Sequence, residues 1–241
     1  MLNARIPLVG VDCSECGKPP AYDVAATQAL LLDEPGIRQL FSVKPAHYSA
    51  KEIVYSEGAE ADTVIVIRSG MVKLISYLAN GRARIVRVHA KGSWLGLGGV
   101  LGQPYEHTAV AVEGADAYRI PVSELLRIKS ENPYLYCRLI ECWFDYLKEA
   151  DLWIAEFSTG SIKARVARLV KFLSKIEDQA ASGEVKLLTC EDMAEILGAT
   201  PESVSRVLAE FKRSNILSPS RAHTADSYQR NTTALDMIAQ H

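Results

Sequence analysis

Short runs of alternating apolar and polar residues fill the chain between about residues 40 and 121. Successive side chains of a strand point to opposite faces, so this alternation predicts half-buried strands. The runs cover residues 63–68, 71–78, 82–89, 108–113 and 115–120. Asn80-Gly81, between the second and third runs, is a strong signal for a two-residue hairpin. Strands at this regular spacing predict a small β-roll, also called a jelly roll.

A long helix is predicted next, from residue 133 to about 157. Apolar residues recur there at spacings of three and four, which is the heptad pattern of a coiled-coil seam. The seam consists of Tyr136, Ile140, Trp143, Leu147, Ala150, Ile154 and Phe157. A second apolar stripe beside it consists of Leu135, Leu139, Cys142, Tyr146 and Trp153. A helix that is apolar over so wide an arc must bury two faces. We expect one face to meet the β-roll and the other to meet a second copy, although burial inside one large domain is the alternative.

The stretch from residue 189 to 217 carries the signals of two short helices joined by a tight turn. Thr189 is a suitable N-cap, and Gly198 supplies the left-handed conformation that ends a helix. Thr200 caps again, and Pro201 stands at the first helical position, where its missing N–H costs nothing. Asn215 can take the left-handed stop of the second helix. This order of signals predicts a helix-turn-helix.

The second of these helices is expected to have an apolar and a polar side. Its apolar stripe consists of Val204, Val207, Leu208 and Phe211. The residues that lie off the stripe are Glu202, Ser205, Arg206 and Arg213. Such a polar face suits the edges of DNA bases. The alternative is a plain helical hairpin, with Glu202 and Arg206 forming an i,i+4 ion pair on its surface.

The segment ATPESVSRVLAEFKRSNIL resembles the recognition helix of the CRP/FNR family of bacterial transcription regulators. The form Glu-x-x-Ser-Arg is nearer to the FNR branch, because the CRP branch has Gly where Ser205 stands. The resemblance covers the chain from about residue 35. It implies a homodimer on a palindromic promoter site with half-sites like TTGAT, double-stranded DNA as the partner, and contact with RNA polymerase.

The resemblance also implies roles for single residues. Arg206 is expected to bond to guanine O6 and N7, and Glu202 is expected to accept from cytosine N4. Ser205 then serves a thymine or a phosphate. The same DNA-binding surface is expected to include Thr200, Ser203, Lys212 and Arg213, of which the last two meet phosphates.

The expected fold class is α+β, in four parts. These are an N-terminal segment (1–34), a cyclic-nucleotide-binding-like β-roll sensor (35–132), a dimerisation helix (133–157) and a winged helix-turn-helix domain (158–241). Ser158-Thr159-Gly160 breaks the long helix and predicts a hinge, after which Ser161 caps the next helix. In the family a β-hairpin wing follows the recognition helix. Here residues 218–233 lack a clear glycine turn, so we expect an irregular wing.

Composition limits the partners. The chain has 241 residues and a formal net charge of −2, so bulk charge does not direct it to nucleic acid. DNA binding would depend on the local placement of a few cations. No apolar run is long enough for a membrane span, and no signal peptide is recognisable, so we expect a cytoplasmic protein. No nucleophile–base pair or carboxylate pair indicates an enzyme.

The usual cyclic-nucleotide ligands are missing from the expected sensor. The family's nucleotide binders use a Gly-Glu-x-Gly motif and a following Arg-Ser pair. Aligned by the flanking glycines, this chain has Leu97 in place of the Glu, His107 in place of the Arg and Thr108 in place of the Ser. A leucine cannot accept a ribose hydroxyl, and a neutral histidine is a poor phosphate clamp. We therefore do not expect cAMP or cGMP to bind in the usual way.

Metal and redox sensing are the other family options. Cys13 and Cys16 match the first pair of the FNR iron–sulfur ligands, but Tyr22 and Tyr118 stand where the remaining two cysteines belong. A full four-cysteine cluster is therefore not supported. The pair is compatible with a dithiol switch, with half of a metal site shared across a dimer, or with no essential role. Haem sensing would need an axial ligand from the histidines before residue 158, which are His47, His89 and His107.

Two function classes follow. The favoured one is a DNA-binding transcription regulator controlled by a signal other than a cyclic nucleotide, for which redox state, oxygen and NO are the candidates. The alternative is a cupin-like ligand or metal sensor module whose helical C-terminus mediates protein contacts.

Overall fold

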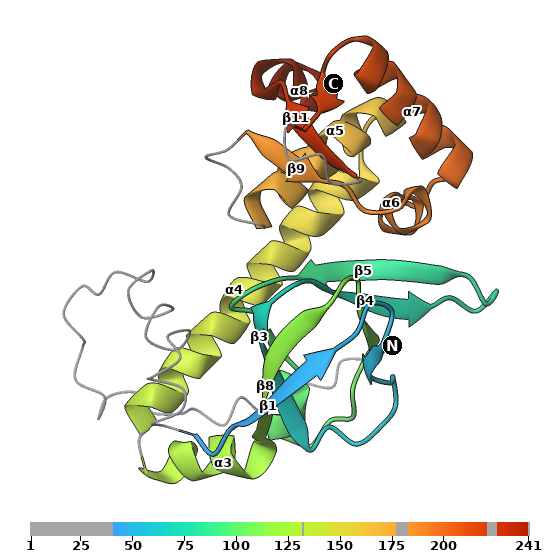
Figure 1. Cartoon of the computed structure of the whole chain (residues 1–241). Helices are drawn as coiled ribbons and strands as arrows, with labels where there is room; N and C mark the ends of the chain where they lie inside the picture. The colour runs from blue at the N-terminus through green and yellow to red at the C-terminus, as the bar shows by residue number, and fades with distance from the viewer. Residues whose placement is uncertain (1–40, 132, 177–182, 221–225, 241) are drawn as a thin grey trace, which may run out of the picture.

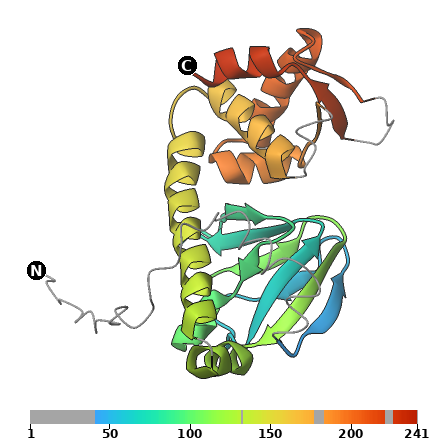
Figure 2. The same cartoon turned by 90° about the vertical axis from the view of Figure 1, so that its left-hand side faces the viewer.

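The computed structural model describes residues 41–131, 133–176, 183–220 and 226–240. A β-roll lies at one end and a small helical domain at the other (Figure 1). Helix α4 (Pro133–Ser158) runs along the roll and on toward the helical domain (Figure 2). The expected N-terminal segment 1–34, with Cys13 and Cys16, lies outside the described residues. The predicted α+β class is confirmed.

The described part of the roll has two antiparallel four-stranded sheets, ordered β1-β8-β3-β6 and β2-β7-β4-β5. Their bounds are β1 Lys44–Tyr48, β2 Ile53–Tyr55, β3 Thr63–Ser69, β4 Val72–Tyr77, β5 Ala83–His89, β6 Trp94–Leu95, β7 Thr108–Ala111 and β8 Ala115–Pro121. Strand β3 is buried on both faces, which explains its unbroken apolar run. The hairpin expected at Asn80-Gly81 joins β4 to β5, with Gly81 at φ 77°.

Two short helices of the roll were not predicted from the sequence. The 3-10 helix η1 (Leu97–Leu101) follows β6, and α3 (Val122–Glu131) follows β8. Helix α3 buries Val122, Leu125 and Ile128 in the same core as residues of β3 and α4. Its apolar residues stand at helical spacing, but the helix is only ten residues long and follows β8 without a break.

Helix α4 is confirmed, but the predicted division of its faces is partly wrong. Tyr136, Leu139, Trp143 and Tyr146 pack on the roll. Trp153 and Phe157 meet Phe172 of the next helix in edge-to-face ring contacts. The outward face consists of Ile140, Phe144, Leu147 and Ile154. Tyr136, Trp143 and Phe157 therefore do not belong to the outward seam, and Phe144 does.

The helical domain contains α5 (Ile162–Ile176), α6 (Cys190–Leu197), α7 (Pro201–Arg213) and α8 (Thr232–Ala239). A three-stranded antiparallel sheet, ordered β10-β11-β9, packs beside them. Its strands are β9 Glu184–Lys186, β10 Leu217–Pro219 and β11 Ser227–Arg230. Strands β10 and β11 pair in a regular register, so the expectation of an irregular wing is wrong for the described residues.

One apolar core crosses from the roll to the helical domain. It joins Ile75, Ile85 and Val88 of the β4–β5 hairpin to residues of α5, α6 and α7. None of the helices in the described ranges is long and apolar enough to cross a membrane.

Candidate DNA-binding surface and effector pocket

The helix-turn-helix forms because its local signals agree. The Thr189 hydroxyl accepts from the Asp192 amide at 3.1 Å and starts α6. Gly198 ends α6 in the left-handed conformation, at φ 59°. The Thr200 hydroxyl then accepts from the Ser203 amide at 3.3 Å, with Pro201 in the first turn of α7. Asn215, at φ 53°, has the expected left-handed stop. These caps fix the turn and therefore the direction in which α7 leaves it.

Helix α7 has the two sides that its sequence predicts. Val204, Val207, Leu208 and Phe211 are buried. The exposed residues include Glu202, Ser205, Arg206, Lys212 and Arg213. No Glu202–Arg206 ion pair forms among the described residues, so the arrangement does not support the surface-pair alternative.

The polar face is held in place at both ends of α7. The backbone N–H of Glu202 itself, and then the Thr200 hydroxyl, lower the pKa of the Glu202 carboxyl, so it stays an acceptor. At the other end the Lys212 ammonium donates to the Tyr228 hydroxyl at 2.8 Å and lies 4.4 Å from the centre of that ring. The wing strand β11 thus orients a cation next to the exposed face.

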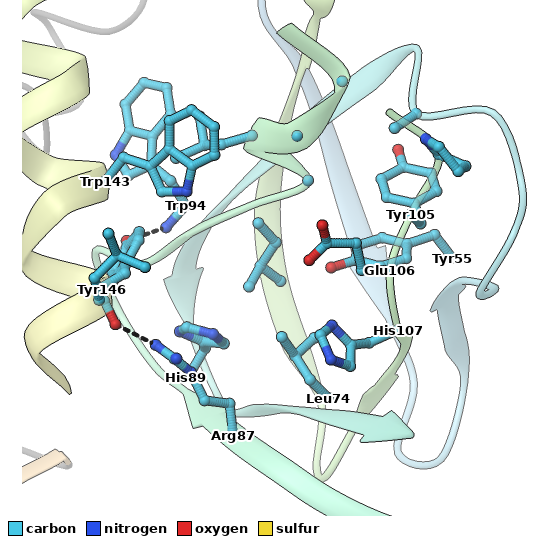
Figure 3. A pocket seen from close by; sticks show the side chains of 18 residues that line it. Tyr55, Leu74, Arg87, His89, Trp94, Tyr105, Glu106, His107, Trp143 and Tyr146 are labelled. Carbon is cyan, nitrogen blue, oxygen red and sulfur yellow. Dashed lines mark hydrogen bonds between the residues drawn. The ribbon is translucent and has the colours of Figure 1, made fainter. Parts of the chain in front are cut away.

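A cavity of about 220 Å³ lies between the roll and α4 (Figure 3). Its walls are largely aromatic, from Tyr55, Trp94, Tyr105, Trp143 and Tyr146. The rings of Tyr55 and Tyr105 stack, with centroids 3.8 Å apart. Burial, and then the neighbouring Tyr105 and Glu106, raise the pKa of the Tyr55 hydroxyl, so the phenol stays protonated.

Strand β5 contributes the side chains of Arg87 and His89 to the lining of the same cavity. The Arg87 guanidinium donates to the Tyr146 carbonyl oxygen at 2.7 Å. His89 is buried, and this burial, with Arg87 and His107 nearby, lowers the pKa of its imidazole to about 3. His89 is therefore neutral at physiological pH. Figure 3 shows Glu106 and His107 across the cavity from Trp143 and Tyr146.

Comparison with known proteins assigns the chain. The model of the cyclic nucleotide-binding domain matches residues 45–132, and that of the Crp-like helix-turn-helix domain matches residues 167–226. Regulatory protein HlyX of Actinobacillus pleuropneumoniae is 26% identical over 195 residues, which cover 77% of this chain and 80% of HlyX. The chain belongs to the CRP/FNR family of transcription regulators.

Other members of the CRP/FNR family are similar to this chain in sequence and in fold. Nitrogen fixation regulation protein FixK of Azorhizobium caulinodans is 25% identical over 209 residues, covering 85% of this chain and 81% of FixK. The solved structure of FixK2 from Bradyrhizobium japonicum has the same fold. It superposes with a TM-score of 0.73 at 23% identity, over 81% of this chain and 96% of that chain.

Two of the three residues expected at the family's effector position border the cavity, and the third does not. Leu97 and His107 are the two that line it. Burial lowers the pKa of His107, so its ring is neutral. Thr108 is buried and is not among the lining residues, and its hydroxyl accepts from the Glu57 amide at 3.1 Å. The position that holds phosphate in the family's nucleotide binders thus has no charged side chain here, and Thr108 lies outside the lining of the cavity.

Several lining residues had no clear sequence signal. Trp94, Tyr105, Arg87 and His89 meet across strands β5 and β6 and the loop before β7. Residues two apart in a strand lie on the same face, as Arg87 and His89 do, but nothing in the sequence indicates which face borders a cavity.

Among the described residues, no group of three His, Cys, Asp or Glu side chains is placed so that it could hold a metal ion. This part of the chain therefore adds no support to the metal hypothesis. His47 is exposed and lies 2.8 Å from the Asp116 carboxylate. His89 and His107 both border the cavity, although it is small and lined by aromatic rings.

Proposed function

We propose that this regulator is a homodimer that reads a palindromic TTGAT-like site with α7 and answers to a signal other than a cyclic nucleotide. The observation that carries the proposal is the exposed row of Glu202, Ser205 and Arg206 on a capped helix, opposite a buried apolar stripe. A helix presented in this way can enter the major groove with its first turns toward the bases.

The chemistry of the row supports specific contacts. Arg206 is long, planar and exposed, so it can bond to O6 and N7 of one guanine. The Glu202 carboxylate can accept from a cytosine amino group, with Ser205 between them. Thr200 and Ser203, at the start of α7, and Lys212 and Arg213, at its end, suit the phosphates on either side.

Dimerisation through α4 is supported by its outward face. Ile140, Phe144, Leu147 and Ile154 are large, apolar and exposed along one side of the helix. Their spacings of four, three and seven residues are those of a coiled-coil seam. Two copies related by a two-fold axis would cover this face and present two α7 helices to the two halves of a palindrome.

The cavity supports a signal that is not a cyclic nucleotide. At the positions that hold ribose and phosphate in the family's nucleotide binders, Leu97 and the neutral His107 offer no partner for a ribose hydroxyl and no cation for a phosphate. Arg87, a cation elsewhere in the lining, already donates to the Tyr146 carbonyl oxygen. The signal then reaches the protein through another small molecule in the cavity or through Cys13 and Cys16. Anaerobic purification tests the second route. Visible absorbance, bound iron or an altered thiol count supports it, and a colourless, metal-free protein whose DNA affinity ignores oxidants contradicts it.

The test of DNA reading is fluorescence anisotropy with a TTGAT-N4-ATCAA duplex and its single-base variants. Arg206→Ala should weaken binding to the intact site and lose the preference at the guanine, by about 1–3 kcal/mol per half-site. Arg213→Ala is the matched control. It should weaken binding to all sequences alike and lower the salt dependence. An Arg206→Ala variant with unchanged base preference would contradict base reading by α7.

A further inference from the structure

The β4–β5 hairpin has one face on the cavity and the other on the helix-turn-helix. Leu74, Arg87 and His89 line the cavity. Ile75, Ile85 and Val88 enter the apolar core shared with α5, α6 and α7. A register shift between Leu74 and Ile75 permits this arrangement, because it brings Arg87 opposite Leu74 and Ile85 opposite Ile75. The hairpin is therefore a single wall between the sensor cavity and the DNA reader.

Side chains of this wall contact both ends of helix α6. At its N-terminal end, Lys73 of β4 forms an ion pair with Asp192, and both side chains are largely buried. At its C-terminal end, the guanidinium of Arg84 from β5 lies directly against Gly198 in the turn. Arg165 of α5 reaches the same end and donates to the Leu197 carbonyl at 2.6 Å. Two cations thus lie where the helix dipole and the last carbonyls of α6 are negative.

The contact at Gly198 is so close that a side chain there would displace the Arg84 guanidinium. A Cβ placed on Gly198 would lie 2.2 Å from Arg84 Nη1 and 3.1 Å from Arg84 Cζ. Gly198 also has φ 59°, the left-handed conformation that favours glycine. The turn is therefore fitted to the β5 side chain as well as to its own backbone.

We infer that Arg84 is a positioning residue for DNA reading, which holds the turn between α6 and α7 at a fixed place on the sensor domain. The inference rests on the proposed function of α7. Helix α7 begins at Pro201, three residues after Gly198, so the place of the turn sets the place of Glu202 and Arg206. In a dimer both copies of α7 must meet half-sites one helical turn apart. A small shift of each turn would prevent simultaneous engagement.

The same strand connects this contact to the cavity. Arg87 follows Arg84 by three residues and bonds to the Tyr146 carbonyl on the cavity side. A molecule in the cavity that shifted the backbone of β5 would also shift Arg84, which contacts the turn. The contact at Gly198 therefore offers a route from the cavity to the reader.

The experiment is a double-mutant cycle with Arg84→Ala and Gly198→Ala in the full-length protein. Affinity for the TTGAT-N4-ATCAA duplex is measured at several salt concentrations. We expect Arg84→Ala to weaken specific binding about tenfold, with Arg84→Lys recovering part of it. The dependence on salt should stay unchanged, because the residue positions the reader and does not bind phosphate. Arg82→Ala, which removes an exposed arginine of the same hairpin, is the matched control and should change binding less than twofold.

The double variant separates positioning from general damage. Gly198→Ala displaces the Arg84 guanidinium from the turn and so removes the same contact. Adding Arg84→Ala should then cost little more, and the combined loss should be smaller than the product of the single losses. A combined loss equal to that product overturns the inference. A salt slope that falls by about one for each Arg84 removed also overturns it, because it indicates a direct phosphate contact.

Hydrogen exchange without DNA distinguishes this inference from the proposed function. We expect Arg84→Ala to speed exchange in α6 and β5 and to leave β3 and β8 unchanged. Wild-type protein that binds the duplex, together with an Arg84→Ala variant of unchanged exchange and affinity, overturns the positioning role alone. If the wild type does not bind the duplex, the proposed DNA site fails, and the exchange data still decide whether Arg84 holds the turn.

Discussion

Phe144 stands on the outward face of α4, between Ile140 and Leu147, with 56% of its surface exposed in the single chain. If α4 pairs with its copy in a dimer, Phe144 is covered there. Replacing Phe144 by alanine should therefore weaken the dimer. It should not disturb the fold of each chain, because this side chain contributes little to the apolar core of its own chain.

The size of the effect follows from the area that remains to be buried. Full burial of a Phe side chain contributes about 1.5–3 kcal/mol. Phe144 has about half of that still to gain, which gives roughly 1–1.5 kcal/mol for each copy. A symmetric dimer carries the substitution twice, so the loss is about 2–3 kcal/mol. The dimer Kd should rise about 30- to 150-fold.

Sedimentation equilibrium or mass photometry over a dilution series measures this Kd. Met237→Ala is the matched control, because Met237 is 60% exposed but lies on α8, away from the α4 face. It should leave the Kd within about twofold, which corresponds to under half a kcal/mol. An unchanged Kd for Phe144→Ala, or an equal effect of Met237→Ala, would refute the assignment of this face.

Three further predictions concern the cavity, the wall and the turn. The pKa of His89 is lowered to about 3, so below pH 6.5 the unfolded chain binds a proton that the folded chain does not, and stability falls as the pH falls. By pH 5 the loss should reach about 2 kcal/mol in urea denaturation. His89→Gln should remove this slope, His47→Gln should keep it, and equal slopes in both variants would count against the burial of His89. Lys73→Met leaves Asp192 largely buried and unpaired, so thermal unfolding should show a loss of about 1–3 kcal/mol. Swapping the two charges, with Lys73→Asp and Asp192→Lys together, should recover part of the lost stability. A swapped variant no more stable than Lys73→Met would argue against a stabilising Lys73–Asp192 ion pair. Thr200→Ala removes the N-cap of α7 and should cost about 0.5–2 kcal/mol, seen as faster hydrogen exchange in its first turn. An unchanged exchange rate there would show that the cap contributes nothing.

The helix-turn-helix was predictable from the sequence because its signals are local. Thr189, Gly198, Thr200 and Pro201 each act within one helical turn, so their effect does not depend on the rest of the fold. The same holds for the alternation of the β4 and β5 strands and for the turn at Asn80-Gly81. The exposed polar row of α7 followed directly from its apolar stripe.

The faces of α4 show where periodicity stops being informative. The helix is apolar around most of its circumference, and a spacing of three and four fits more than one stripe. The roll covers Tyr136 and Trp143, and α5 covers Phe157, which leaves Phe144 outside. Which stripe of α4 stays exposed depends on which other elements pack against the helix. Those elements are distant from most of α4 in the sequence.

The sequence by itself determined that this chain carries a capped helix-turn-helix, a series of short strands and a long apolar helix, because the signals for each element lie in residues close together in the chain. The tertiary structure alone decided that Arg87 and His89 border the cavity and that Arg84, on the same strand, meets Gly198 in the reader's turn. The contact between Arg84 and Gly198 joins residues more than a hundred positions apart, and Arg87 meets Tyr146 across 59 positions. Only the packing of the β4–β5 hairpin between the cavity and α6 brings them together.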